Sequence, residues 1–325
     1  MSNRTVEDAK KILDNNWNRQ IILYGPPGTS KTYSATIIAA KMLGYEGDDY
    51  KEAEAHLAEN KGRYKLIQFH PSYSYEDFVR GVSVKPNAGG GVTYEPEDKI
   101  FGDFCKKAAD DKGKKNPYVL VIDEINRAPL ASVLGELIYG LEYRGQPVDT
   151  PYAIEDGDYT LTVPENLYII GTMNTADRSI GSIDYAVRRR FAFVHVPSEP
   201  LKIEGSWEYI GGVVEHLYKE LMNPKTGIFG EEHNLLEDLE MDVEDIKIGH
   251  TYFLGKKKGE SQEDKPSKED EKAKEDEIAY MNYRIKYQIK PIYMEYIKDG
   301  LIKKEGEKIF EKIIEKWEDW KPELK

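Results

Sequence analysis

The sequence predicts a parallel, doubly wound α/β domain followed by a smaller helical domain. Short apolar runs that suit buried strands alternate with stretches whose apolar residues recur at helical spacing. One such run, PYVLVIDE (117–124), is apolar enough to be covered on both faces, which is typical of a strand inside a parallel sheet. Strands that alternate with helices in this way indicate a parallel sheet with helices on both faces. The length of 325 residues suggests about two domains.

The predicted elements of the sheet domain follow one another in a regular order. They are a helix over 5–18, a strand over 20–25, a helix over 32–43, a strand over 64–70, a hairpin over 81–97, a helix with a polar loop over 99–116, a strand over 117–124, a helix over 130–141, a strand over 167–174, a helix over 182–190 and a strand over 191–196. Gly44 is a suitable stop for the second helix, because glycine readily takes the conformation that ends a helix. The hairpin is expected because two alternating runs flank a glycine-rich turn. An apolar stripe from Leu130 to Leu141 predicts the helix over 130–141.

The boundary of the sheet domain is expected near Pro197. The stretches 207–222 and 278–302 beyond it have a helical pattern. Residues 1–197 are therefore expected to form the α/β domain, and residues 198–325 a helical domain. The run 255–277 contains hardly any apolar residue, so it is expected to be a solvated, mobile loop.

The composition excludes several classes of protein. The only cysteine is Cys105, so the chain can form neither an intramolecular disulfide nor a cysteine-rich metal site. The formal net charge is −13, which excludes a chain that is basic as a whole and grips nucleic acid by charge. No apolar run is long enough for a membrane span, and the N-terminus lacks the apolar core of a signal peptide. A reducing cytoplasm is the expected location, with no membrane contact.

A glycine-rich loop follows the strand over 20–25 and opens the next helix. The predicted nucleotide-binding residues are Gly25, Pro26, Pro27, Gly28, Thr29, Ser30, Lys31, Thr32 and Tyr33. In this context the backbone N–H groups and the helix N-terminus cradle phosphates. Lys31 is expected to reach the β- and γ-phosphates, and the Thr32 hydroxyl to bind Mg²⁺. Ser30 stands where the usual pattern has glycine, but its side chain is small and argues only weakly against phosphate binding. Ser30→Gly is expected to retain hydrolysis.

A second motif, VLVIDEIN, ends the strand over 117–124. Four apolar residues bring Asp123 to the carboxyl edge of a strand, where ligands of open α/β sheets bind. Asp123 is predicted to hold Mg²⁺, directly or through water. Glu124 is predicted to orient and polarise the attacking water. Together with the loop, this acidic pair indicates a site that hydrolyses a nucleoside triphosphate.

Two further motifs contribute polar and basic residues. Asn174 ends the strand over 167–174, where its amide can hydrogen-bond a γ-phosphate or the attacking water, although Asn is also common in turns without a function. Arg188, Arg189 and Arg190 lie together at the end of a predicted helix. They either neutralise the helix C-terminus or include an arginine finger that reaches the nucleotide of a neighbouring subunit. Both interpretations of the arginines stay open.

These motifs, in this order, resemble the AAA+ ring ATPases and, more narrowly, the McrB type, the GTP-hydrolysing motors of modified-cytosine-specific restriction systems. The resemblance covers roughly residues 17–300. It rests on QFHPSYSYEDFVRG (68–81), DEINRAPLASVLGELIYGLE (123–142), MNTADRSIGSIDYAVRRRF (173–191) and IGHTYFL (248–254). It implies an AAA+ P-loop NTPase fold, with a parallel doubly wound sheet and a C-terminal helical lid domain.

The resemblance also implies roles, cofactors and partners. The residues concerned are Lys31 and Thr32 for the phosphates and the metal, Asp123 and Glu124 as the second acidic motif, Asn174 as the first sensor, and Arg188 or Arg189 as the arginine acting in trans. The implied cofactors are Mg²⁺ and GTP. The implied assembly is a homo-oligomeric, hexameric ring with a McrC-type nuclease that stimulates hydrolysis and cuts DNA. Family members carry a DNA-reading domain before the motor, so DNA contact is expected through the assembled complex or a domain outside this chain.

Several alternatives remain at this point. The McrB type favours GTP, whereas the wider AAA+ group uses ATP, and the NTAD segment (174–177) is not expected to read guanine because it follows a strand that faces the phosphates. The alternative function is that of a MoxR-like AAA+ ATPase chaperone that remodels protein complexes, and a third is a nucleotide-gated scaffold. The hairpin over 81–97 either projects into a ring pore, with Lys85 on a DNA backbone, or forms a packing flap. His250 is expected to be a structural histidine that braces the lid.

Overall fold

The chain divides into two compact units. The computed structural model describes residues 3–86, 90–111, 113, 116–154, 157–177, 183–198, 218–229, 231, 242–253 and 279–320. The sheet unit comprises Asn3–Tyr24 and Lys31–His195, and the C-terminal unit comprises Gly25–Ser30 together with the residues from Val196 onward. The glycine-rich loop Gly25–Ser30 is thus grouped with the C-terminal unit, although both of its neighbours in the sequence belong to the sheet unit.

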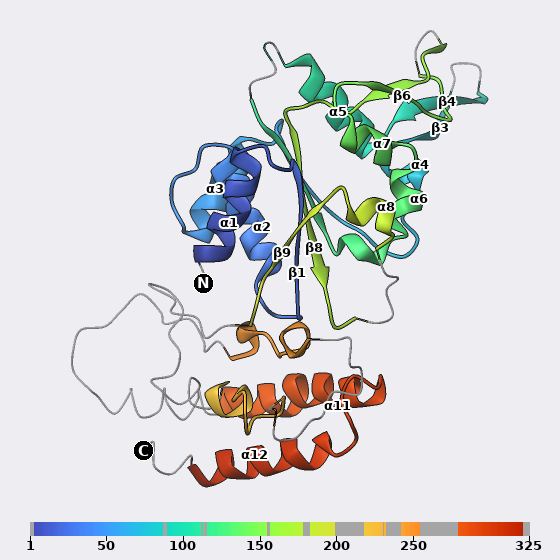
Figure 1. The fold of residues 1–325 in the computed structure, drawn as a ribbon. Coiled ribbons are helices and arrows are strands. Elements are labelled where there is room, and N and C mark those ends of the chain that lie inside the picture. The colour runs from blue at the N-terminus through green and yellow to red at the C-terminus, as the bar shows by residue number, and fades with distance from the viewer. Residues whose placement is uncertain are drawn as a thin grey trace. The chain divides into compact units, whose positions relative to one another are not determined.

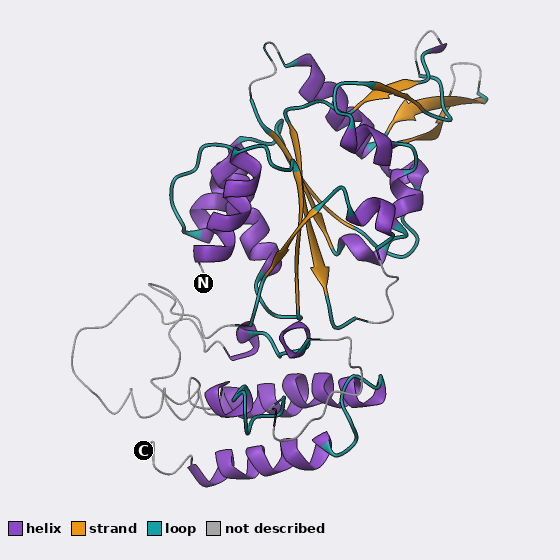
Figure 2. Cartoon of the chain, viewed as in Figure 1, coloured by secondary structure: helices purple, strands orange, loops and turns teal. Residues whose placement is uncertain are grey.

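The sheet unit alternates helices and strands. Its elements are α1 (Asn3–Asp14), β1 (Gln20–Gly25), α2 (Lys31–Met42), α3 (Tyr50–Glu59), β2 (Tyr64–Gln68), α4 (Tyr75–Phe78), β3 (Arg80–Pro86), β4 (Val92–Asp98), α5 (Ile100–Asp110), β5 (Tyr118–Asp123), η1 (Ile125–Arg127), α6 (Leu130–Leu134), α7 (Leu137–Glu142), β6 (Pro147–Asp149), β7 (Thr160–Thr162), β8 (Leu167–Asn174), α8 (Tyr185–Arg188) and β9 (Ala192–His195). Helices α1, α2 and α3 lie on one side of the central strands, and α5, α6 and α7 lie on the other (Figures 1 and 2). The sheet is therefore covered on both faces.

The central sheet has five strands in the order β2-β5-β8-β1-β9. The pairs β2–β5, β5–β8 and β1–β9 are parallel. The predicted parallel, doubly wound sheet is thus confirmed. Because β5 and β8 are neighbours with the same direction, the residues at their carboxyl ends, Asp123 and Asn174, lie at the same edge of the sheet.

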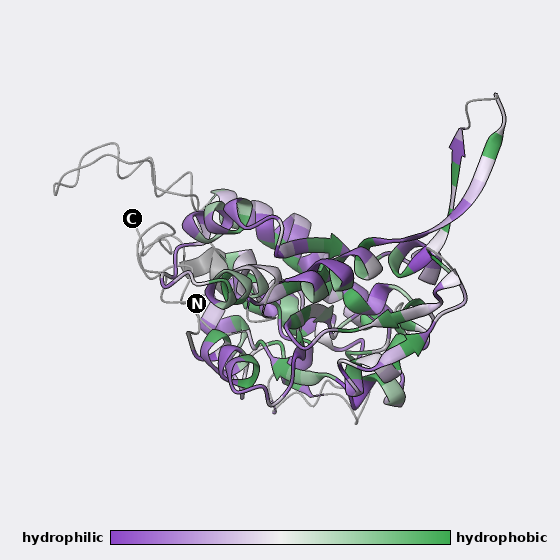
Figure 3. Cartoon of the chain, turned by 90° about the horizontal axis from the view of Figure 1, so that it is seen from above, coloured by the Kyte–Doolittle hydropathy of each residue, from purple (hydrophilic) through white to green (hydrophobic). Residues whose placement is uncertain are grey.

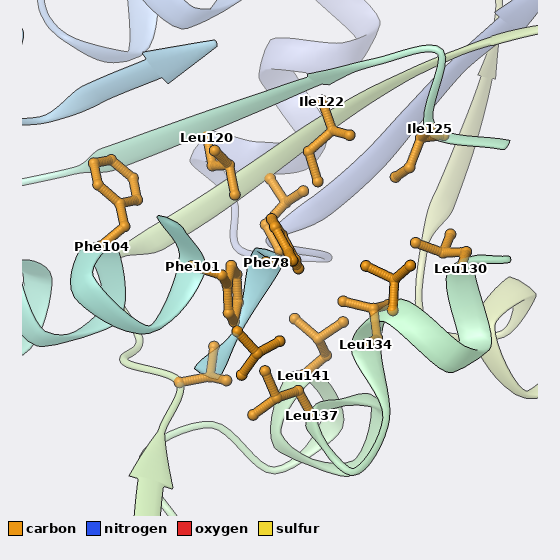
Figure 4. Close-up of a cluster of buried hydrophobic side chains, with 14 of the residues drawn as sticks. Phe78, Phe101, Phe104, Leu120, Ile122, Ile125, Leu130, Leu134, Leu137 and Leu141 are labelled. Atoms are coloured by element: carbon orange, nitrogen blue, oxygen red, sulfur yellow. The ribbon is translucent and has the colours of Figure 1, made fainter. Parts of the chain in front are cut away.

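The core beneath β5 is built from aromatic and aliphatic side chains. Phe101 of α5 packs in one buried cluster with Leu120 and Ile122 of β5 (Figure 4). The ring of Phe78 stacks on Phe101, with the ring centroids 5.1 Å apart. Each such side chain contributes about 1.5–3 kcal/mol when it is fully buried. This packing fixes β5 firmly, and so fixes the position of the acidic residues at its end.

Strands β3 and β4 form a two-stranded arm that extends away from the helices of the sheet unit (Figure 3). Arg80 anchors its base, with Nε donating to Asp98 Oδ1 at 2.7 Å in a nearly buried ion pair. One face of the arm carries exposed apolar side chains, including Val84 paired with Tyr94. The predicted hairpin is therefore present, and on the opposite face Lys85 pairs with Glu95 at 2.8 Å. A role for the arm in a ring pore stays a prediction.

The structure departs from the predicted elements at several points. Helix α3 and the short β6–β7 hairpin are additional. Asp49 precedes helix α3 and caps it, because its side chain accepts the Glu52 N–H at 3.0 Å. The helix expected over 130–141 is divided at Gly135, which takes φ +52° and ends α6 before α7 begins. The first helix ends at Asp14, earlier than predicted.

The C-terminal unit is largely helical where the structure describes it. Residues 279–284 are helical and lead into a π-helical turn, Ile285–Ile289, then α11 (Lys290–Lys298) and α12 (Gly306–Trp320). The buried ring of Tyr293 stacks on Phe310, with centroids 5.0 Å apart, and so ties α11 to α12. The shorter 3₁₀ turns are η4 (Val243–Asp245) and η5 (His250–Phe253). The loop predicted over 255–277 lies outside the described residues, and the division at residue 197 stays a prediction.

Within the described ranges, no helix combines the length and the apolar character needed to cross a membrane.

Candidate functional site

The carboxyl edge of the sheet brings Asp123 together with two hydroxyl groups. Thr32, in the first turn of α2, donates from Oγ1 to Asp123 Oδ1 at 2.7 Å. Thr172 of β8 donates to the same carboxylate oxygen at 2.6 Å. The predicted metal residues Thr32 and Asp123 are therefore in direct contact, and both offer the oxygen ligands that Mg²⁺ prefers.

The protein alone offers few ligands to a metal at this edge. Among the described residues, no group of three or more His, Cys, Asp or Glu side chains could hold a metal ion. Mg²⁺ commonly binds through one or two protein ligands, completed by water and by phosphate oxygens of a substrate. Thr32 and Asp123 fit this mode, so metal binding here would depend on the nucleotide.

Glu124 lies next to Asp123 in a strained backbone conformation. Its φ and ψ of 53° and 46° are left-handed, which costs an ordinary residue about 1–2 kcal/mol and is commonest at functional sites. The Glu124 N–H donates to Thr172 Oγ1 at 3.0 Å, and Asn174 Nδ2 donates to Glu124 Oε1 at 2.6 Å. The other carboxylate oxygen, Oε2, is buried and accepts no hydrogen bond within the described part of the chain. Glu124 thus has one oriented oxygen and one available acceptor.

A basic residue also faces this carboxylate. Arg127, in η1, places its Nε 3.4 Å from Glu124 Oε2 and one terminal nitrogen 3.8 Å from Asp177 Oδ2. Asp177 follows the strand that carries Asn174, so Arg127 links the segments after β5 and β8. That the segment containing Asp177 does not read guanine stays a prediction.

Lys31 begins α2 and is almost entirely buried, at 7% exposure. Burial lowers its pKa from the ordinary value of 10.5 to about 8, and the charges of Glu124 and Asp123 act in the opposite direction. A pKa near 8 leaves the ammonium protonated at pH 7. The sheet edge therefore places the buried Lys31 ammonium near the carboxylates of Asp123 and Glu124, which suits an anionic ligand that brings its own metal.

The loop Gly25–Ser30 has the backbone conformations of a tight turn. Gly28 and Ser30 take φ values of +77° and +63°, and the Thr29 hydroxyl donates to Pro26 O at 3.0 Å. A side chain at Gly25 would collide with Val196 O, because its Cβ would lie 2.4 Å from that oxygen. The Ser30 Oγ lies 3.0 Å from His250 Nε2.

The last of the predicted nucleotide-binding residues, Tyr33, packs against helix α3. Its ring stacks on Tyr50 of α3, with centroids 4.6 Å apart. Burial raises the pKa of the Tyr33 hydroxyl, with smaller contributions from Asp49 and Asp48. Tyr33 therefore contributes to the α2–α3 contact, and its predicted role in nucleotide binding stays a prediction.

The three consecutive arginines have different surroundings. Arg190 forms an ion pair with Glu142 at 2.7 Å, and its side chain is only 9% exposed. Arg189 is 65% exposed and lies 3.5 Å from the same carboxylate. Arg188 is exposed and rests 4.9 Å from the centre of the Phe193 ring, with no ion pair among the described residues. Arg190 is therefore paired within this chain, whereas Arg188 and Arg189 are both exposed, and a role for either of them in trans stays a prediction.

Three residues that contact the predicted site residues were not themselves predicted to belong to the site: Thr172, Arg127 and His250. Thr172 precedes Asn174 by two positions on one strand, so the two-residue period of a strand would have placed both on one face. Arg127 follows Glu124 by three positions, a spacing that suits a helical turn. His250 lies 220 positions from Ser30, and no local pattern predicts that contact.

Comparison with known proteins agrees with this geometry. The chain is 33% identical over 305 residues to the type IV methyl-directed restriction enzyme EcoKMcrB subunit of Escherichia coli (strain K12), a match that covers 93% of this chain and 58% of the relative. It is 25% identical over 225 residues to the type II restriction enzyme BsuMI component YdiS of Bacillus subtilis (strain 168), covering 58% of this chain and 61% of the relative. The resemblance to the McrB type is thus confirmed. The chain spans about 60% of the length of these two relatives.

The fold family is shown by a match over the sheet unit. Among solved structures, C. elegans PCH-2 has a TM-score of 0.30 and 16% identity, covering 74% of this chain and 48% of that chain, and so low a score adds no evidence. The family described as AAA domain (dynein-related subfamily) matches residues 20–191, which is more than half of the chain. This range contains the glycine-rich loop, the acidic pair and Asn174. The chain therefore belongs to the AAA domain family, in its dynein-related subfamily.

Proposed function

We propose that this chain hydrolyses a nucleoside triphosphate with Mg²⁺ and acts as the motor subunit of a restriction complex. The observation that carries the proposal is the convergence of Thr32, Asp123, Glu124 and Asn174 at one edge of the parallel sheet. Membership of the AAA domain family supports the use of a nucleotide and Mg²⁺. The names of the two relatives, both components of restriction enzymes, support the system in which the motor works.

The residues of the chain have separable roles in this proposal. The loop from Gly25 to Ser30 binds the phosphates through its N–H groups, and Lys31 adds a positive charge. Thr32 and Asp123 hold Mg²⁺, which when bound neutralises phosphate charge in the transition state.

Glu124 is proposed as the residue that positions the attacking water. Its Oε1 is held by the Asn174 amide, and its Oε2, which lies 3.4 Å from Arg127 Nε without a hydrogen bond, is proposed to accept a water proton. The strained backbone of Glu124 and its N–H bond to Thr172 keep the carboxylate from turning away. Asn174, which is neutral, can hold the carboxylate without adding a repulsive charge beside the phosphates.

The finer parts of the proposal concern the nucleotide and the assembly. We propose GTP as the preferred substrate, on the strength of the McrB resemblance, with ATP as the alternative. The active form is proposed to be a hexameric ring in which Arg188, or else Arg189, reaches the nucleotide of the next subunit. A McrC-type nuclease is the proposed partner, and DNA is contacted through the complex or through a domain outside this chain.

Steady-state phosphate release tests the proposal. The chain is assayed with GTP and with ATP, with Mg²⁺ and with excess chelator, and with and without a McrC-type nuclease. The proposal expects Mg²⁺-dependent hydrolysis that is faster with GTP and is stimulated by the nuclease. ATP hydrolysis that ignores the nuclease would instead favour the chaperone alternative, and no hydrolysis under any condition would refute the enzymatic role.

A further inference from the structure

Two consecutive carbonyl groups of the phosphate-binding loop are bound by a short segment of the C-terminal unit, residues 249–251. The Gly249 N–H donates to Pro27 O at 3.1 Å, and the Thr251 N–H donates to Gly28 O at 3.0 Å. The Thr251 hydroxyl donates to the same Gly28 oxygen at 2.9 Å. Both carbonyls therefore point towards the segment, which we call the clasp.

The clasp determines where the loop's N–H groups point. In a trans peptide the C=O and N–H groups point in opposite directions, and the described chain contains no cis peptide bond. Binding Pro27 O therefore turns the Gly28 N–H away from the clasp, and binding Gly28 O does the same for the Thr29 N–H. Successive N–H groups turned to one side form an anion-binding concavity.

Ser30 adds a side-chain contact to the clasp that glycine could not make. Its φ of +63° lies in the left-handed region, which is unfavourable for an ordinary residue and which glycine adopts readily. The Ser30 Oγ lies 3.0 Å from Nε2 of His250, whose ring is buried at 3% exposure. The serine at this position thus offsets an unfavourable backbone conformation with a bond to the clasp.

The clasp is tightly packed and braced from behind. A Cβ at Gly249 would lie 2.0 Å from the carbonyl carbon of Gly28, so no side chain fits there without moving the loop. Arg284 donates from Nη1 to Thr251 O at 2.6 Å, and from Nη2 to the Tyr280 hydroxyl at 2.7 Å. The helical residues 279–284 therefore hold the clasp in place.

We propose that the clasp and the Ser30–His250 contact are positioning elements that pre-form the phosphate-binding loop before a nucleotide arrives. This inference rests on the proposed function and deepens it. Ser30 and His250 act here through the loop backbone, not on reacting atoms. The proposal also makes the loop's affinity for phosphates depend on the C-terminal unit, so that a displaced clasp weakens binding.

The first test replaces Gly249. Gly249→Ala is compared with Gly62→Ala, whose added Cβ would meet nothing within 4 Å. Amide hydrogen exchange of Thr251, whose N–H donates to Gly28 O, is measured in the nucleotide-free full chain, and the Kd of a fluorescent GTP analogue is measured beside it. Loss of the clasp bonds is expected to speed this exchange and weaken binding by about tenfold, while Gly62→Ala matches the parent.

The second test is a double-mutant cycle of Ser30→Ala and His250→Leu, with His250→Gln as the conservative variant and Ser132→Ala as the control. Alanine is chosen because it resists the left-handed conformation as serine does, so only the hydroxyl is lost. The two changes are expected to be non-additive in Kd by about fivefold, the ratio for one hydrogen bond of about 1 kcal/mol. KM should rise more than kcat falls, and glutamine should restore part of the affinity.

The outcomes separate the inference from the proposed function. Unchanged Thr251 exchange in Gly249→Ala, or full additivity of Ser30→Ala and His250→Leu, would overturn the inference. Faster exchange with unaltered nucleotide affinity would overturn it too, because the clasp would then not prepare the loop for phosphates. If the parent chain bound no nucleotide at all, the proposed function itself would be wrong.

Discussion

Replacing Lys31 with methionine is expected to stabilise the nucleotide-free sheet unit and to weaken nucleotide binding. Burial lowers the Lys31 pKa from 10.5 to about 8, even though Glu124 and Asp123 partly oppose that shift. One pKa unit corresponds to about 1.4 kcal/mol, so the buried charge costs the fold about 3 kcal/mol at pH 7. Methionine has a similar length and carries no charge, so it removes this cost while leaving the pocket filled.

The expected gain from Lys31→Met depends on pH in a defined direction. The folded pKa lies below the unfolded one, so between about pH 8 and 10.5 the unfolded chain keeps a proton that the folded chain has released. The stability of the parent therefore rises with pH across this window. Below pH 8 the cost is fully present, and the advantage of Lys31→Met should shrink towards zero as the pH approaches 10.5.

The assay for Lys31→Met follows the sheet unit by itself, because a chain with two units need not unfold in one step. Hydrogen exchange of the β1, β5 and β8 amides is read by mass spectrometry across a urea series at pH 7 and at pH 10, with exposed Lys61→Met as the control. Nucleotide affinity at pH 7 should fall by about tenfold to a hundredfold, as expected for a lost charged hydrogen bond. A variant less stable than the parent at pH 7, or an advantage that does not change with pH, would refute the reasoning.

Three further predictions concern Thr172, which binds the Glu124 backbone, and the arginines at positions 188 and 190. Thr172→Val removes the acceptor of the Glu124 N–H, so we expect the free energy of unfolding to fall by about 1–3 kcal/mol. Hydrolysis should become slower while the nucleotide Kd stays nearly unchanged. An equal loss in nucleotide affinity and in kcat would contradict this prediction. Arg190→Ala should lower the melting temperature, because removing this nearly buried arginine takes the closest cation away from Glu142. Arg188→Ala should melt at the same temperature as the parent. In mixtures, Arg188→Ala subunits should depress the hydrolysis of unmodified neighbours, and hydrolysis that falls only in proportion to dilution would argue against an action in trans.

Local sequence patterns predict the sheet edge well. The strands that end at Asp123 and Asn174 are both buried and run parallel as neighbours. The positions of these strand ends in the sequence therefore suffice to predict that the two side chains lie close together. The glycine-rich loop is recognised by its context between β1 and α2. Gly135 shows the limit of the helical pattern, because the apolar stripe continues smoothly across a glycine whose backbone ends one helix and starts another.

Contacts between distant parts of the chain could not be predicted in the same way. Ser30 looks like a weakened phosphate loop when it is considered alone, and its bond to His250 becomes visible only in three dimensions. The two-residue period of its strand places Thr172 on the same face as Asn174, but its contacts with Asp123 and with the Glu124 backbone depend on the neighbouring strand β5. Such side chains act through geometry that composition and periodicity do not encode.

Glu124→Gln tests the central claim most directly. Glutamine preserves the size of the side chain and an oxygen for the Asn174 amide, but it cannot act as a base. We predict that the variant binds GTP and Mg²⁺ with a Kd close to that of the parent, while phosphate release falls by at least about a hundredfold. Phosphate release at the parent's rate by Glu124→Gln would contradict the assignment of this residue, and with it the account of the sheet edge as a hydrolytic site.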